Sequence, residues 1–311
     1  MGFANDIRTE ILDNRPHGAA IKLAQLGGLT FSCASIRLGR LPKLVYSTEY
    51  LRTAKHIMQL AETLYQVDIT MSQRVQEHKS VPLFTVTLSG SEVGRMLNDL
   101  GILIDGEDGV RIMQTPPDYL LPDEDCSRAF IRGYFLGAGT MCDPDSGYRL
   151  ELICRNAELA NFLCALVASF TLDAKVAKRK SRFIVYLNEG DGVSGFMVLC
   201  GAPNSAMRFE DIRVQKDISN YINRRSNCET SNLDKQVTAC ARQISQIQCV
   251  LRHTASEDLP DSLREAAELR QAHPTATLSE LARLAGIHKS GMNHRLKRIA
   301  QMAHDLEGFD G

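Results

Sequence analysis

The sequence predicts an α+β fold, in which a two-repeat αββαββα domain is followed by an all-α helix-turn-helix domain. Helical and strand patterns occur in similar order on both sides of residues 104–126, and the pattern of residues 83–101 returns 99 positions later. After residue 220 the strand pattern ends and helical periodicity remains. These observations predict one domain built from two halves, and a separate helical domain.

The first repeat is expected over residues 1–103 and the second over 127–220, each with the approximate order αββαββα. In the first repeat we expect helices and strands at residues 17–28, 29–38, 43–47, 50–65, 67–72, 83–88 and 91–101. In the second repeat we expect them at residues 127–139, 148–154, 156–170, 174–180, 182–187 and 190–202.

The segment 104–126 is predicted to be an acidic linker. It contains Asp-Gly steps, a Pro-Pro pair and a third proline, and it shows no sustained periodicity. From Asp99 to Asp125 there are eight acidic residues against Arg111, a balance of −7. The net charge of −1 for the whole chain therefore hides basic regions elsewhere.

The opening helices of the two repeats carry small residues at a spacing of four. Ala20, Ala24 and Gly28 share one helix face, as do Gly133 and Gly137. Such stripes also arise by chance on a tightly packed helix. We interpret them as the faces along which the two helices pack against each other and join the halves.

The composition indicates a globular cytoplasmic protein. Charged residues interrupt every apolar run before it is long enough to span a bilayer, and the N-terminal residues lack the apolar core of a secretion signal. The nine cysteines include no CxxC pair, so we expect reduced, mostly buried thiols and no metal cage. Asp143, Asp145 and Glu151 are candidate metal ligands, but Asp-Pro-Asp-Ser-Gly is better explained as a turn.

The C-terminal part is predicted to be helical throughout. A connecting helix is expected over residues 221–255, with Thr230 or Ser231 as its N-cap. A helix-turn-helix domain is expected over 256–305, where a helix between Pro260 and Pro274 precedes the motif. In residues 277–299 the pattern predicts a helix, a turn at Gly286 and a second helix.

The second helix of this motif leaves hydrogen-bonding side chains on its outward face, as a recognition helix in the major groove requires. Residues 270–304 contain six basic residues against Glu280, a balance of +5, which favours contact with a polyanion. Arginines are suited to backbone phosphates. The predicted DNA-binding residues are Thr277, Ser279, Arg283, His288, Lys289, Ser290, Asn293, His294, Arg295, Lys297 and Arg298.

A second basic stretch lies in the strand pair 175–186, which has five basic residues and no acidic one. It predicts an accessory surface that contacts phosphates or another protein, although a solvated sheet edge has the same pattern. The accessory residues are Lys175, Lys178, Arg179, Lys180 and Arg182.

The two halves and their paired helices resemble the LAGLIDADG homing-endonuclease fold. Residues 131–139 match its nonapeptide with glycines at positions 133 and 139, and residues 20–28 match it more loosely. The resemblance implies that the metal-binding acids of that family fall at Gly27 and Ala138, which cannot hold a cation. Because such hydrolysis needs carboxylates that hold Mg²⁺, we expect no catalytic residue, no metal and no cofactor.

With its C-terminal helix-turn-helix, the chain resembles WhiA-type bacterial regulators over nearly its whole length. The resemblance lies in FIRGYFLGAG, INRRSNCETSNLDK and TLSELARLAGIHKSGMNHRLKRI. It implies a transcription regulator that binds double-stranded DNA, mainly through the helix-turn-helix, and is linked to sporulation, cell division or chromosome segregation. It also implies a cytoplasmic, nucleoid-associated protein, with another transcription regulator or RNA polymerase as a candidate partner and no membrane contact.

Two other classes of protein stay open at this point. A scaffold protein could use the helix-turn-helix for protein contacts, and salt-dependent DNA binding would distinguish it from a regulator. An active DNA endonuclease would need a carboxylate at residue 27 or 138, and neither position has one.

Overall fold

The computed structural model describes residues 2–37, 39–75, 81–106 and 109–307. It divides into two compact units, Met1–Lys216 and Asp217–Gly311, and each has its own hydrophobic core. The division falls close to residue 220, where the strand pattern of the sequence ends.

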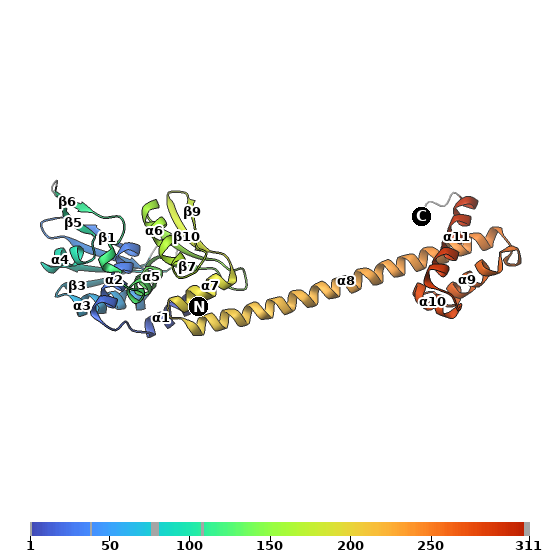
Figure 1. Cartoon of the computed structure of the whole chain (residues 1–311), viewed down its shortest axis with the longest axis horizontal. Helices are drawn as coiled ribbons and strands as arrows, with labels where there is room; N and C mark the ends of the chain where they lie inside the picture. The colour runs from blue at the N-terminus through green and yellow to red at the C-terminus, as the bar shows by residue number, and fades with distance from the viewer. Residues whose placement is uncertain (1, 38, 76–80, 107–108, 308–311) are drawn as a thin grey trace. The chain divides into compact units, whose positions relative to one another are not determined.

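In the first unit both repeats have the predicted order αββαββα (Figure 1). An additional helix, α1 (Phe3–Asp13), precedes them. The first repeat contains α2 (Ala19–Cys33), β1 (Ala34–Arg37), β2 (Lys43–Thr48), α3 (Leu51–Leu64), β3 (Asp68–Val75), β4 (Pro82–Ser89) and α4 (Glu92–Asp99). The second contains α5 (Glu124–Ala138), β7 (Gly139–Met141), β8 (Leu150–Cys154), α6 (Ala157–Ala168), β9 (Lys175–Arg179), β10 (Arg182–Leu187) and α7 (Gly190–Leu199).

Each repeat forms a four-stranded antiparallel sheet. The strand order is β1-β2-β4-β3 in the first repeat and β7-β8-β10-β9 in the second. In β4, Phe84, Val86 and Leu88 are buried, whereas the residues between them are partly exposed. This alternation is typical of a sheet with one face on the core. The edge strands β3 and β9 are mostly exposed.

Helices α2 and α5 pack against each other through their small residues, as predicted (Figure 1). A Cβ atom on Gly28 would lie 2.1 Å from the carbonyl oxygen of Phe130. A Cβ atom on Gly133 would lie 2.1 Å from the carbonyl oxygen of Gln25. Since both neighbours are backbone atoms, only glycine permits this approach.

These contacts correct the expected helix end in the first repeat. The sequence predicts a helix that ends at Gly28 and a strand from residue 29, but α2 continues to Cys33. The extra turn is helical because Leu29 and Ser32 are buried, and a Cβ on Gly137 would lie only 2.0 Å from the Ser32 hydroxyl oxygen. Packing against α5 therefore decides the conformation of residues that have a strand-like pattern.

The contacts also correct the alignment of the two repeats. Gly28 and Gly133 each face the backbone of the opposite helix, an offset of 133 − 28 = 105 residues. The helix ends Cys33 and Ala138 have the same offset, 138 − 33 = 105. The alignment of residues 20–28 with residues 131–139 in the sequence analysis has an offset of 131 − 20 = 111 residues and is therefore wrong. With the offset of 105, the counterparts of residues 131–139 are residues 26–34.

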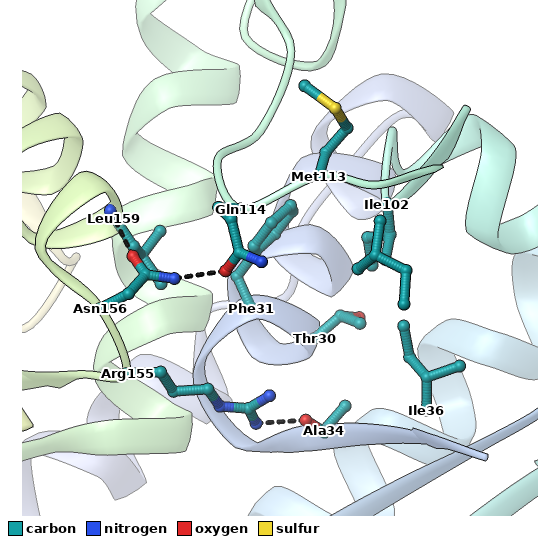
Figure 2. A pocket seen from close by; sticks show the side chains of 11 residues that line it. Thr30, Phe31, Ala34, Ile36, Ile102, Met113, Gln114, Arg155, Asn156 and Leu159 are labelled. Carbon is teal, nitrogen blue, oxygen red and sulfur yellow. Dashed lines mark hydrogen bonds between the residues drawn. The ribbon is translucent and has the colours of Figure 1, made fainter. Parts of the chain in front are cut away.

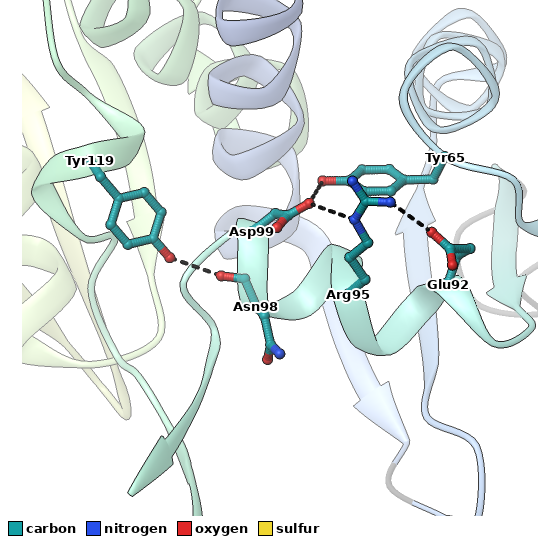
Figure 3. Close-up of polar contacts among 6 residues, drawn as sticks. All are labelled: Tyr65, Glu92, Arg95, Asn98, Asp99 and Tyr119. Carbon is teal, nitrogen blue, oxygen red and sulfur yellow. Dashed lines mark hydrogen bonds and ion pairs between the residues drawn. The ribbon is translucent and has the colours of Figure 1, made fainter.

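The segment predicted as a linker contains secondary structure in its described residues. Strands β5 (Leu103–Gly106) and β6 (Gly109–Ile112) pair antiparallel, and a short 3-10 helix, η1, spans Asp118–Leu120. The Tyr119 hydroxyl donates to the carbonyl oxygen of Asn98 at 2.8 Å, beside a cluster in which Arg95 and Tyr65 both contact Asp99 (Figure 3). The segment is therefore fixed to α4 rather than loosely tethered.

The connecting helix is longer than expected. Helix α8 runs without interruption from Pro203 to His253, so Thr230 and Ser231 lie in its interior and are not N-caps. The N-terminus of α8 is instead capped by Glu10, whose carboxylate accepts hydrogen bonds from the backbone amides of Asn204 and Ser205.

All secondary-structure elements in the described residues of the second unit are helices. The end of α8 packs with α9 (Asp261–Ala272), α10 (Leu278–Leu284) and α11 (Lys289–Glu307), and a 3-10 turn, η2 (Ser256–Asp258), precedes α9. Pro260 and His273 bound α9, close to the limits that the two prolines predict. Its core joins Ile247 and Val250 of α8 to Leu281 of α10 and to Met292 and Leu296 of α11.

Candidate nucleic-acid interface

The helix-turn-helix of α10 and α11 has the local geometry that its sequence predicts. Thr277 and Glu280 form a capping box at the start of α10, because each side chain bonds the backbone of the other residue. Gly286 has a φ of +64° between the helices. The Ile287 amide donates to the carbonyl oxygen of Ala282 at 2.9 Å, which closes the turn.

The burial of α11 separates a core face from an outward face. Met292, Leu296 and Ile299 are buried against the other helices of the unit. The predicted residues that remain exposed in α10, the turn and α11 are Ser279, Arg283, His288, Lys289, Ser290, His294, Lys297 and Arg298. Asn293 is half-buried at the edge of this face. The unit therefore presents hydrogen-bonding and cationic side chains on one accessible helix surface.

Two of the predicted contact residues are engaged within the protein. The Thr277 hydroxyl donates to the Glu280 carboxylate at 2.9 Å and accepts from the Glu280 amide. The Arg295 guanidinium lies 2.7 Å from the carboxylate of Glu265 on α9, and its side chain is 21% exposed. Glu265 was not among the candidate residues, because nothing in its sequence position indicates this pairing.

Arg270 is a basic residue of the +5 stretch that does not reach the surface. Its side chain is buried, and its guanidinium donates to the carbonyl oxygen of Ala276 at 2.6 Å. With Arg295 paired, the exposed bases of this stretch are Arg283, Lys289, Lys297 and Arg298. The surface therefore carries fewer free positive charges than the sequence count suggests.

The accessory residues form the hairpin of β9 and β10 in the first unit, with Lys180 at the turn. Lys175 pairs with Asp173 at 3.1 Å and Arg179 contacts Glu151 at 3.6 Å, so acids compensate both charges. Lys178, Lys180 and Arg182 are exposed. The hairpin thus has a smaller free positive charge than five basic residues imply.

The corrected alignment moves the positions of the metal-binding acids to Cys33 and Ala138. Ala138 has no ligand atom in its side chain. Burial raises the pKa of the Cys33 thiol to about 12, so the side chain is a neutral thiol at neutral pH. Hard cations such as Mg²⁺ select carboxylate and other oxygen ligands. Neither residue fits a magnesium ion, and Gly27 is not one of the two positions.

Each of these helices ends beside an arginine. The buried Arg8 donates to the carbonyl oxygen of Gly139, directly after α5. Arg155 donates to the carbonyl oxygen of Ala34, directly after α2 (Figure 2). The partial negative charge at the carboxyl end of a helix stabilises a positively charged side chain there. That side chain in turn repels a metal ion. Sequence reasoning missed both arginines because they lie far from the helices along the chain.

A pocket of about 190 Å³ lies beside Arg155, between residues of both repeats (Figure 2). Phe31, Ile36, Ile102 and Leu159 make much of its wall apolar. Across its rim, the Asn156 side chain donates to the Gln114 side chain. These contacts connect α6 to the segment between the repeats.

Two of the three acids considered as metal ligands, Asp143 and Glu151, have structural partners for their carboxylates. The Asp143 carboxylate accepts from the Asp145 amide at 3.0 Å within the turn, and Glu151 pairs with Arg149 at 2.6 Å. Within the described ranges, no three His, Cys, Asp or Glu side chains gather as metal ligands would. No disulfide joins any of the nine cysteines, all of which lie in the described ranges, and among them Cys228 is the one on the exposed surface. No helix in the described part of the chain is both long and apolar enough to cross a membrane.

Comparison with known proteins finds the same two domains. A family model described as the WhiA LAGLIDADG-like domain matches residues 127–219, and one described as the WhiA C-terminal HTH domain matches residues 222–303. A "Probable cell division protein WhiA" from Alkaliphilus metalliredigens is 36% identical over 99% of this chain and 99% of its own length. A protein of the same name from Exiguobacterium sibiricum is 36% identical over 98% of this chain and 97% of its own.

A solved structure has the same fold over the whole length. The crystal structure of full-length WhiA from Thermotoga maritima has a TM-score of 0.60 and covers 98% of this chain and 99% of its own. Its sequence identity is 19%, so this match concerns the fold alone. It agrees with a LAGLIDADG-like domain followed by a helical helix-turn-helix domain.

Proposed function

Because this chain belongs to the WhiA family, we propose that it is a DNA-binding transcription regulator without nuclease activity. The observation that carries the proposal is the accessible face of α11, where Ser290, His294 and Lys297 are exposed beside a compact helical core. A helix with such a face, placed second in a helix-turn-helix, fits the major groove of double-stranded DNA.

In this proposal the predicted residues have separate roles. Lys289, Ser290, Asn293, His294 and Lys297 contact base edges, to which their side chains can hydrogen-bond. Arg283 and Arg298 contact backbone phosphates, as do Ser279 and His288 near the helix starts. Thr277 and Arg295 contribute less, because Glu280 and Glu265 already engage them.

The test removes two exposed cations from the interface of the full-length chain. Lys289→Ala with Lys297→Ala is expected to weaken duplex binding and to flatten the plot of log affinity against log salt by about one to two units. The control is Lys235→Ala with Arg242→Ala, which removes the same charge from exposed positions of α8. Unchanged affinity and slope in the first pair would refute the assignment of this interface.

The same titration separates a regulator from a scaffold protein. A scaffold that uses the motif for protein contacts has no salt-dependent affinity for duplex DNA, so a chain that ignores DNA in dilute buffer favours that alternative. For a regulator, the accessory hairpin would add phosphate contacts or receive a protein partner such as another transcription regulator or RNA polymerase.

Loss of nuclease activity is proposed from the residues at the ends of α2 and α5. Cys33 and Ala138 supply no carboxylate there, and Arg8 and Arg155 bring positive charge to the helix ends. We expect no nicking of supercoiled DNA with Mg²⁺ or Mn²⁺. Nicking that persists through stringent purification and that a variant of this site abolishes would show an active enzyme.

The cellular role is inferred from the names of the relatives. The curated relatives are named probable cell division proteins, and we propose a role in cell division, chromosome segregation or sporulation for this chain, acting on the nucleoid. Genome-wide mapping of its bound sites tests that role, because sites scattered without relation to genes of these processes would contradict it.

A further inference from the structure

Another pocket of the first unit has basic side chains in its wall, and none of its residues is among those assigned to DNA binding. It has a volume of about 410 Å³, in the range of small-molecule sites. Its walls come from the loop before α2, the first turn of α2 and one face of α3, and its lining residues include Arg15, His17, Lys22, His56, Gln59 and Glu62.

The start of α2 contributes to the chemistry of this pocket. His17 precedes the N-cap residue Gly18, and Lys22 lies in the first turn. Gly18 has no side chain that could cap the helix. The first amide of α2 that donates within the helix is that of Lys22, which bonds to the Gly18 carbonyl oxygen at 3.2 Å. The amides of residues 19–21 therefore have no partner inside the helix. Such a terminus favours an anion.

A buried histidine in the wall is the second observation that points to a ligand. His56 is 7% exposed, and its Nε2 atom is buried without a hydrogen-bond partner in the described structure. The Nε atom of the neighbouring Arg132 is also buried without a partner. Polar atoms in this state cost free energy unless a ligand or water satisfies them.

The charges around His56 are cationic. Burial, together with the positive charges of Arg15 and Arg132, lowers the pKa of His56 to about 4. Glu62 is the single acidic residue among those that line the pocket, and it is exposed. Arg15, Lys22 and Arg132 outweigh it, so an anion in the pocket would relieve repulsion among like charges.

We propose that this pocket binds a free small molecule that carries a phosphate or similar oxyanion. Arg15 and Lys22 pair with its charge, His17 lies beside it just before α2, and His56 forms the floor beneath it. Occupancy is independent of DNA binding, because no residue of the pocket belongs to the helix-turn-helix.

The test uses inorganic phosphate and pyrophosphate as probes of the full-length chain in a chloride buffer. Calorimetric titration is expected to show saturable binding, which Arg15→Gln with Lys22→Gln weakens by about tenfold or more through loss of two charge-assisted contacts. The matched control, Lys43→Gln with Lys55→Gln, removes equal charge from exposed residues outside the pocket and leaves binding within about twofold. Histidine ¹⁵N resonances should report the same titration at His56.

Three results would overturn the proposal. The first is an absence of saturable binding of either probe to the wild-type chain, and the second is an equal loss of binding in the control pair. The third is a tenfold loss of duplex affinity in Arg15→Gln with Lys22→Gln, which would assign the anion to the DNA backbone. Lys289→Ala with Lys297→Ala should leave phosphate binding unchanged, so failure of the proposed DNA interface does not affect this test.

Discussion

The Arg295 guanidinium on α11 lies 2.7 Å from the Glu265 carboxylate on α9. This ion pair holds α11 against α9 within the second unit. It also neutralises the charge of Arg295, which in the sequence lies between the exposed His294 and the buried Leu296. The pair therefore reduces the positive charge that the motif offers to DNA.

Glu265→Gln is expected to release Arg295 toward the duplex. The released charge should steepen the salt dependence of duplex binding by up to about one unit, because each phosphate contact adds about that much. Gel shifts over a series of salt concentrations measure the slope. Glu268→Gln removes the same charge from an exposed position on α9, and an equal change of slope in that control would contradict a specific role for the pair.

The sequence predicts which segment is basic but not which cations are free. Arg270 and Arg295 count equally with Lys297 in the composition, yet one is buried against backbone carbonyls and the other is paired across helices. Both outcomes depend on tertiary packing, since Arg270 is also buried against Cys240, 30 residues away, and Arg295 pairs with Glu265 of another helix. The motif itself was predictable, because Thr277, Gly286 and the apolar positions act through local geometry.

Gly133→Ala should strongly destabilise the first unit. The new Cβ would lie 2.1 Å from the Gln25 carbonyl oxygen and 3.2 Å from the Leu29 amide nitrogen, so the two helices would have to separate. Overpacking of this kind, directed at backbone, is expected to cost about 3 kcal/mol or more. Urea unfolding of the full-length chain, followed by a probe in the first unit, measures the loss.

Gly94→Ala is the control for this substitution. Gly94 lies in α4 and its Cβ would meet no atom within 4 Å, so the change should be neutral or stabilise the unit by up to about 1 kcal/mol. If Gly133→Ala were as well tolerated as Gly94→Ala, the close crossing of α2 and α5 would be wrong.

The crossing also shows where sequence reasoning reached its limit. The small-residue stripes correctly predicted that the opening helices pack together, but the adjacent Gly27 and Gly28 allow more than one alignment. Three-dimensional contacts select Gly28, and with it the positions Cys33 and Ala138. Helix α8 shows a related limit, since Thr230 and Ser231 are capping types but no Gly or Pro after Pro203 interrupts the helix.

Thr277→Ala should loosen α10 more than Ser279→Ala does. Thr277 caps the helix and exchanges hydrogen bonds with Glu280, whereas Ser279 is exposed within the first turn. Loss of the cap is expected to cost about 1 kcal/mol. Amide hydrogen exchange in α10 measures the local opening. Equal exchange rates in the two variants would show that the capping box contributes nothing in solution.

His56 should make the stability of the first unit depend on pH. Burial, with Arg15 and Arg132 nearby, lowers its pKa to about 4 in the folded chain, below the ordinary value of 6.5. The unfolded chain therefore takes up a proton first as the pH falls. Stability attributable to His56 is fully present above pH 6.5 and is lost progressively between pH 6.5 and 4, by up to about 3 kcal/mol.

Urea unfolding at pH 7 and pH 5 in chloride buffer measures this effect. His56→Phe should remove that part of the pH dependence, because Phe fills a similar volume and cannot take up a proton. The exposed His288 provides the control, since His288→Gln should keep the wild-type dependence. Phosphate added at pH 5 should raise the stability of the wild-type chain above that of Arg15→Gln with Lys22→Gln, since a ligand that binds only the folded state stabilises it. If wild type and His56→Phe lost stability in parallel, the protonation of another group would have to explain the pH dependence.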